Sequence, residues 1–198
     1  SFEGVIYDTA SIASLHALAA ARETAVPNVR AHGLAGRTDV LPLRIYVSDQ
    51  AHSSIEKAAI TLGIGQEGVR KIPTDPQFRM RVDLLRAAIE EDRTSGCQPM
   101  AVVATVGTTS TTSVDPVGDI AEVCHRTGLW LHVDAAYAGA AALVPETASV
   151  LDGCNHADSL VVNPHKWLFT PFDLSAFYCR RMDTLRTTFA LTPEYLST

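Results

Sequence analysis

Hydrophobic and polar positions form two alternating patterns along the chain. Short runs rich in apolar, β-branched or aromatic residues predict strands at residues 44–48, 69–72, 100–106, 129–133, 159–162 and 175–179, and the run 100–106 is apolar almost throughout. Longer stretches with apolar residues three or four positions apart predict helices at residues 10–22, 52–62, 83–93, 118–127 and 183–189. Gly128 directly follows one of these helices, at the position where glycine commonly ends a helix.

The alternation of strands and helices predicts an α/β fold, with a mostly parallel sheet flanked by helices on both faces. In such folds ligands bind at the carboxyl ends of the strands. Polar residues that directly follow a predicted strand are therefore the first candidates for a functional site.

The composition is that of one globular domain, because 198 residues, 46% of them hydrophobic, suffice for a sizeable core. The net charge of −6, without a basic stripe, argues against a nucleic-acid partner. No apolar run approaches the roughly 20 residues of a membrane span. The chain begins with Ser1 and has no signal pattern, so we expect it to begin inside a longer protein.

Four scattered cysteines form no C-x-x-C pair and provide neither a disulfide framework nor a zinc site. We expect the four cysteines to act as small buried hydrophobic side chains, in a protein of the reducing cytoplasm. The cysteines are Cys97, Cys124, Cys154 and Cys179.

Lys166 stands between His165 and Trp167, shortly after the apolar run 160–162. A partly desolvated lysine loses its proton readily and can form a Schiff base with an aldehyde cofactor. A lysine at an ordinary strand-to-loop boundary is the alternative, and this short motif alone favours neither.

Asp134 ends another apolar run and precedes the small residues of 135–139. A carboxylate there needs a cationic partner, such as a protonated pyridine nitrogen, or strong hydrogen bonds. It can instead cap the next turn. A metal pair with His132 is a further alternative, but the sequence shows no third ligand.

Three polar clusters complete the candidate site. The helix start at residues 8–11 suits a phosphate or an ordinary N-cap. The hydroxyl-rich segment 107–112 can bind a ligand or form a plain loop, and His52 can stack on an aromatic ring or cap a helix. Together with Lys166 and Asp134, these features match the protein side of a pyridoxal 5′-phosphate site.

The chain resembles the group II pyridoxal-phosphate-dependent decarboxylases, in particular the aromatic-L-amino-acid decarboxylase branch. The matching stretches occur in the family's order at Gly4–Ser11, Ser48–Ser54, Gly107–Thr109, His132–Gly139 and Asn163–Trp167. The resemblance implies the large domain of a fold type I PLP-dependent transferase, and a homodimer. Residues 1–198 would be this PLP-binding domain alone, without the family's N-terminal segment and smaller C-terminal domain.

The resemblance also implies a role for each site residue. Lys166 would hold the cofactor, Asp134 would pair with the pyridine nitrogen, and His52 would stack on the ring near the substrate carboxylate. The remaining cofactor contacts would be Ala10, Ser11 and Asn163 at the phosphate, Thr109 and Ala136 beside the ring, and His165 at phosphate or substrate. Asp8 departs from the family, because many relatives have glycine or another small residue at this position near the phosphate.

Tyr195 matches a tyrosine that the family carries on a mobile loop and that is linked to protonating the substrate carbon. Relatives with phenylalanine there tend to make aldehydes, so Tyr195 favours decarboxylation of an aromatic L-amino acid to an amine and carbon dioxide. An aldehyde synthase and a non-catalytic PLP-binding domain are the alternatives. A glutamate-specific decarboxylase fits residues 49–54 less well.

Overall fold

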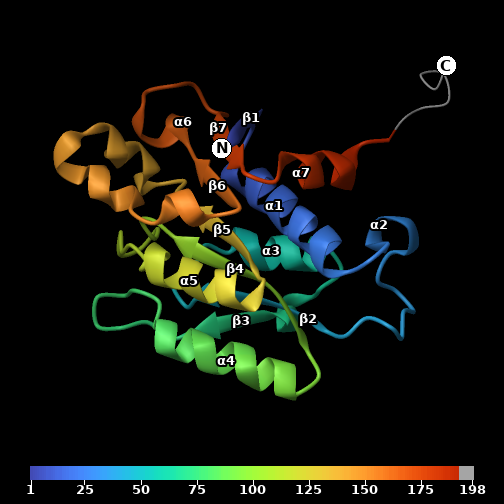
Figure 1. Cartoon of the computed structure of the whole chain (residues 1–198). Coiled ribbons are helices and arrows are strands. Elements are labelled where there is room, and N and C mark those ends of the chain that lie inside the picture. The colour runs from blue at the N-terminus through green and yellow to red at the C-terminus, as the bar shows by residue number, and fades with distance from the viewer. Residues whose placement is uncertain (192–198) are drawn as a thin grey trace.

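The structure, a computed structural model, describes residues 1–191 and is built on one mixed sheet with the strand order β1-β7-β6-β5-β4-β2-β3 (Figure 1). Neighbouring strands are parallel from β3 to β6, whereas β7 runs antiparallel to both β6 and β1. The strands are β1 (Glu3–Tyr7), β2 (Leu43–Ser48), β3 (Val69–Ile72), β4 (Gln98–Thr105), β5 (Trp130–Asp134), β6 (Ser159–Val162) and β7 (Ser175–Cys179). The predicted mostly parallel α/β sheet is confirmed.

Helices cover both faces of the sheet. The helices are α1 (Ala10–Ala25), α2 (Val29–His32), α3 (Ser54–Thr61), α4 (Val82–Thr94), α5 (Val117–Thr127), α6 (Pro164–Trp167) and α7 (Met182–Phe189). Helices α1, α3 and α7 pack in one core cluster, and α4 and α5 pack in the other (Figure 1). Within residues 1–191, no helix combines the length and apolar character required to cross a membrane.

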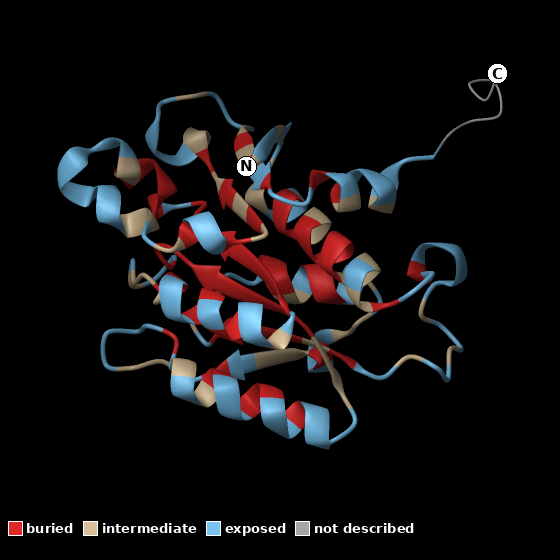
Figure 2. Cartoon of the chain, in the orientation of Figure 1, coloured by how far each residue is buried: buried red, intermediate tan, exposed pale blue. Residues whose placement is uncertain are grey.

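The interior strands are apolar because helices bury both of their faces. From Met100 to Thr105 every residue of β4 is buried, and Figure 2 shows the central strands as a buried layer between two half-exposed helical layers. The two faces of β4 alternate between the clusters, with Val103 on the α1 side and Val102 on the α4 side. This double burial explains why the strand is predictable from its sequence.

Strand β1 is absent from the sequence prediction. It is an edge strand that pairs only with β7, and Glu3 and Gly4 are exposed. An edge strand with one partner lacks the continuous apolar pattern of the interior strands. The short helices α2 and α6 also escape prediction, since each has only four residues.

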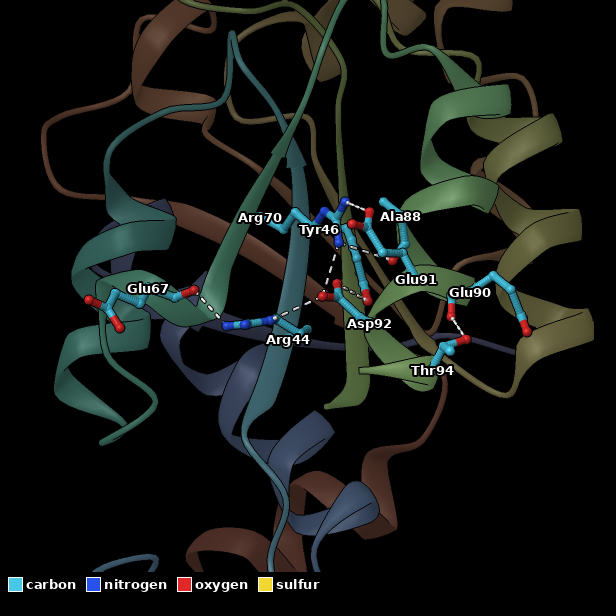
Figure 3. A network of polar contacts seen from close by, with 9 residues as sticks. All are labelled: Arg44, Tyr46, Glu67, Arg70, Ala88, Glu90, Glu91, Asp92 and Thr94. Carbon is cyan, nitrogen blue, oxygen red and sulfur yellow. Dashed lines mark hydrogen bonds and ion pairs between the residues drawn. The ribbon is translucent and has the colours of Figure 1, made fainter. Parts of the chain in front are cut away.

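A buried polar network joins α4 to the amino ends of β2 and β3, opposite the strand ends where a ligand is expected (Figure 3). Asp92 accepts a 2.8 Å hydrogen bond from Tyr46 Oη and lies 3.0 Å from Arg70 Nη1. Arg44 Nε is 3.4 Å from the same carboxylate. Burial and the neighbouring carboxylate raise the pKa of Tyr46, so its hydroxyl stays protonated and donates.

Candidate active site

A cavity of about 190 Å³ lies at the carboxyl ends of β4, β5 and β6. All the sequence-predicted site residues within the described part of the chain line it: Ala10, Ser11, His52, Thr109, Asp134, Ala136, Asn163, His165 and Lys166. Residues up to 156 positions apart (166 − 10) are thus brought to one place by the sheet topology. Tyr195 lies outside the described residues.

Asp134 is the last residue of β5 and is only 7% exposed. Its Oδ1 accepts a hydrogen bond from the backbone N–H of Ala136 at 3.1 Å. Within residues 1–191 the carboxylate forms no ion pair. Because a buried carboxylate without a cation is costly, this position suits a positively charged ligand atom.

The first turn of α1 presents free backbone donors to the cavity. Thr9 is the N-cap residue, and its Oγ1 accepts the N–H of Ile12 at 3.3 Å. The carbonyl of Thr9 accepts the N–H of Ala13 at 3.1 Å. The N–H groups of Ala10 and Ser11 have no acceptor within the helix, so they and the helix dipole favour an anion here.

Asn163 and His165 present a second pair of donors. Ser175 Oγ donates to Asn163 Oδ1 at 2.6 Å, and the Leu174 N–H donates to His165 Nδ1 at 2.9 Å. Asn163 Oδ1 and His165 Nδ1 therefore act as acceptors. The hydrogens of the two side chains are then on Asn163 Nδ2 and His165 Nε2. These two nitrogens lie 3.3 Å apart. Two facing donors without an acceptor between them suit an anionic oxygen.

His52 lies just before α3 and is held by that helix. The backbone N–H of Ser54 donates to His52 Nδ1 at 3.2 Å, which assigns the proton of the neutral imidazole to Nε2. The ring lines the cavity from an exposed position. This contact is the helix-capping alternative expected from the sequence, and it also orients the ring that lines the cavity.

Lys166 lines the cavity from α6. Lys166 is exposed, since it belongs to α6, a one-turn helix in which no residue is buried. Its Nζ lies 6.0 Å from the ring centroid of Tyr137, whose ring packs edge-on against Trp167. The amine is therefore accessible to a ligand in the cavity.

Gly107 allows the loop after β4 to approach the segment after β5. Its φ is +84°, and a Cβ there would lie 2.4 Å from Cβ of Ala138. This close approach brings Thr109 and Ala136 to the same cavity. Lining residues that the sequence reasoning did not assign to the site are Ser54, Thr105, Tyr137 and Phe172.

The metal alternative for His132 and Asp134 lacks support in the geometry. Both ring nitrogens of His132 face serine hydroxyls, and within residues 1–191 no three His, Cys, Asp or Glu side chains are grouped to hold a metal ion. A larger hollow of about 540 Å³ lies at the amino ends of β5 and β6, lined in part by Asp158 and Arg180. Among residues 1–191, none of the predicted site residues lines this hollow.

Known proteins resemble the chain in both sequence and structure. The model of the pyridoxal-dependent decarboxylase conserved domain matches residues 2–198. The aromatic-L-amino-acid decarboxylase of Bos taurus is 46% identical over 98% of this chain, and the histidine decarboxylase of Rattus norvegicus is 42% identical over 98%. A solved structure of Oryza sativa TDC with PLP and tryptamine covers 100% of the chain with a TM-score of 0.90 and 40% identity.

The chain spans only part of these proteins: 39% of the bovine decarboxylase, 29% of the rat enzyme and 40% of the rice chain. The match nevertheless extends over nearly every residue of this chain, and the sheet order and site location agree with the predicted fold type. This chain belongs to the pyridoxal-dependent decarboxylase family.

Proposed function

We propose that the protein is a pyridoxal-phosphate-dependent decarboxylase that converts an aromatic L-amino acid into its amine and carbon dioxide. The observation that carries this proposal is one cavity that combines an accessible lysine amine, a buried carboxylate without a cation, and two sets of unpaired N–H donors. Residues 1–198 would be the cofactor-binding large domain.

The donor set fits a phosphate at one end of the cavity. The N–H groups of Ala10 and Ser11 supply backbone donors at a helix start, and Asn163 Nδ2 and His165 Nε2 supply side-chain donors. These four groups would hold the cofactor phosphate. Asp8 is exposed and next to Thr9, so its charge would weaken this binding without occupying the cavity.

The carboxylate fits a pyridine ring at the other end. Asp134 would hold a proton on the ring nitrogen, because its charge stabilises the adjacent cation. Ala136 has a small side chain beside the carboxylate and would leave room for a flat ring, while Thr109 and the imidazole of His52 would bound the ring on other sides. Lys166 would supply the primary amine that holds the aldehyde carbon.

When bound, pyridoxal phosphate supplies an electron sink that accepts the pair released as the carboxylate leaves. The chain's own residues would orient the groups around this bond. His52 would present its Nε2 proton to the substrate carboxylate, because Ser54 occupies Nδ1. Tyr195, which lies outside the described residues, is our proposed donor of the proton that replaces the carboxyl group.

We further propose a homodimer, supported by apolar side chains that stay exposed around the cavity. Phe172 lines the cavity and is 76% exposed, and the neighbouring Phe169 is also exposed. Monomeric proteins rarely leave such side chains grouped in water. A second copy that covers them would also enclose Lys166. A cytoplasmic location is supported by the four cysteines, all of which are free.

The proposal is tested by assaying the protein for amine and carbon dioxide release on a panel of tryptophan, tyrosine, phenylalanine, histidine and glutamate. Amine release from an aromatic substrate, lost in Lys166→Ala, is expected. Aldehyde with hydrogen peroxide would identify an aldehyde synthase instead, and cofactor binding without any turnover would identify a non-catalytic domain. Amine from glutamate or histidine alone would contradict the proposed substrate class.

A further inference from the structure

His132 lies at the centre of a buried chain of hydrogen bonds that the proposed function leaves unused. Its Nδ1 lies 2.9 Å from Ser159 Oγ and its Nε2 lies 3.1 Å from Ser14 Oγ. Trp130 Nε1 donates to the same Ser159 oxygen at 2.9 Å. His132, Ser14 and Ser159 are all 0% exposed. This chain of hydrogen bonds therefore runs through the core without contact with water.

The histidine and the two serines of this hydrogen-bond chain lie on the three elements that carry the proposed site. Ser14 lies in α1 one turn after Ala10, and His132 precedes Asp134 by two residues on the same face of β5. Ser159 pairs with His132 in register and opens β6, the strand that leads to Asn163. One imidazole thus connects the phosphate-binding helix to the strands that present the carboxylate and the lysine.

The partners match a neutral imidazole. Trp130 Nε1 can only donate, so Ser159 Oγ accepts from it and can donate its own hydrogen to His132 Nδ1. A neutral ring has one N–H, so one ring nitrogen accepts from a serine hydroxyl while the other donates to the second serine.

Burial favours the same state. It lowers the pKa of His132 to about 4, although the charge of Asp134 opposes this shift. The other groups in contact with the ring, Ser14, Ser159 and Phe177, are uncharged. A neutral His132 leaves the Asp134 charge available to a ligand cation, whereas an imidazolium would compete for it.

We propose that His132 is a positioning residue that fixes the spacing between the start of α1 and the carboxylate of Asp134, and that it does so as a neutral group. The proposal rests on the proposed cofactor site, since this spacing must match the distance between the phosphate and the ring nitrogen of one bound molecule. Loss of the Ser14 contact would let α1 shift against β5, and loss of the Ser159 contact would free the imidazole ring that Ser14 contacts. Either change would weaken cofactor binding.

The test compares cofactor affinity with stability in matched variants. Ser14→Ala and Ser159→Ala each remove one hydroxyl from the chain, and Tyr46→Phe removes one equally buried hydroxyl from the Asp92 network at the far end of the sheet. Dissociation constants for pyridoxal phosphate are measured by fluorescence titration, and unfolding midpoints are measured without cofactor. Wild-type protein is titrated first, because failure to bind would contradict the proposed function itself.

We expect all three variants to lose stability, but only the two serine variants to bind the cofactor about tenfold more weakly, as one lost hydrogen bond implies. The double variant should show coupling between the two serines. Equal affinities in the serine variants and Tyr46→Phe would overturn the proposal. As a readout independent of any substitution, ¹⁵N NMR should show a neutral His132 ring at pH 7, and an imidazolium signal would also overturn the proposal.

Discussion

Asn163 Nδ2 and His165 Nε2 face each other at 3.3 Å, although both carry hydrogens and neither offers an acceptor to the other. Ser175 and the Leu174 N–H have taken the remaining acceptors of the two side chains. Such a pair of donors suits a ligand or solvent oxygen that accepts a hydrogen bond from both. We interpret the pair as part of a preformed phosphate site.

Removing one of these donors should weaken phosphate binding. His165→Phe keeps a ring of similar size but removes Nε2, so the dissociation constant for pyridoxal phosphate should rise about tenfold or more. Titration of the cofactor and of inorganic phosphate would measure the change. His156→Phe, at an exposed position outside the cavity, is the matched control. A similar effect in both variants would show that His165 does not contact phosphate.

Asp134→Asn should separate stability from activity. The amide oxygen can still accept the N–H of Ala136, and the buried charge without a cation disappears. The cofactor-free variant should therefore unfold at the same temperature as the wild type or a few degrees higher. Turnover should fall about 100-fold or more, because the charge beside the ring nitrogen is lost. Calorimetry and steady-state kinetics measure the two effects, and near-normal turnover would contradict the assigned role.

Asp115 should make the protein less stable as the pH rises. Its carboxylate accepts N–H groups of Met80 and Thr105 at 2.7 and 2.8 Å, but burial raises the pKa of Asp115 from 3.8 to about 6. The folded state therefore binds this proton more tightly than the unfolded state. The contribution of Asp115 to the free energy of unfolding should fall by about 2 kcal/mol between pH 4 and pH 7.

The comparison of wild type with Asp115→Asn isolates this contribution. Urea unfolding at several pH values should show the wild type losing stability relative to the variant as the pH rises. Curves that stay parallel from pH 4 to pH 7 would rule out a raised pKa for this carboxyl group.

His132 should make the protein more stable as the pH rises from 4 to 7, the opposite of the effect of Asp115. Burial lowers its pKa from 6.5 to about 4, so the folded state resists protonation. The stability that it contributes is fully present above pH 6.5 and is lost as the pH falls toward 4, by about 3 kcal/mol at most. His132→Gln should remove this acid sensitivity in urea unfolding. If the wild type and His132→Gln lost the same free energy of unfolding between pH 7 and pH 4.5, this result would count against a buried neutral His132.

The sequence predicted the interior of the fold because burial on both faces leaves a clear apolar pattern, as in β4 and in β5. It did not predict β1, whose exposed Glu3 and Gly4 are stabilised by pairing with β7 rather than by an apolar pattern. Long-range pairing of this kind leaves no local signal.

The candidate site was predictable where its residues follow strands or match the family motifs. Phe172 reaches the cavity from a loop and was not predicted, since its position depends on how the chain returns after α6. The contact of His132 with Ser14 was also not predicted, because 118 positions separate the two residues. The exposure of Lys166 was not predicted, because it depends on the cover that a one-turn helix offers.

The most direct test of the central claim is to reduce the cofactor-loaded protein with borohydride and to map the labelled peptide. Reduction should attach pyridoxal phosphate permanently to Lys166, and Lys166→Ala should remain unlabelled while Lys57→Ala, outside the cavity, is labelled as the wild type is. A label on another lysine, or no label on a protein that has bound the cofactor, would contradict the proposed site.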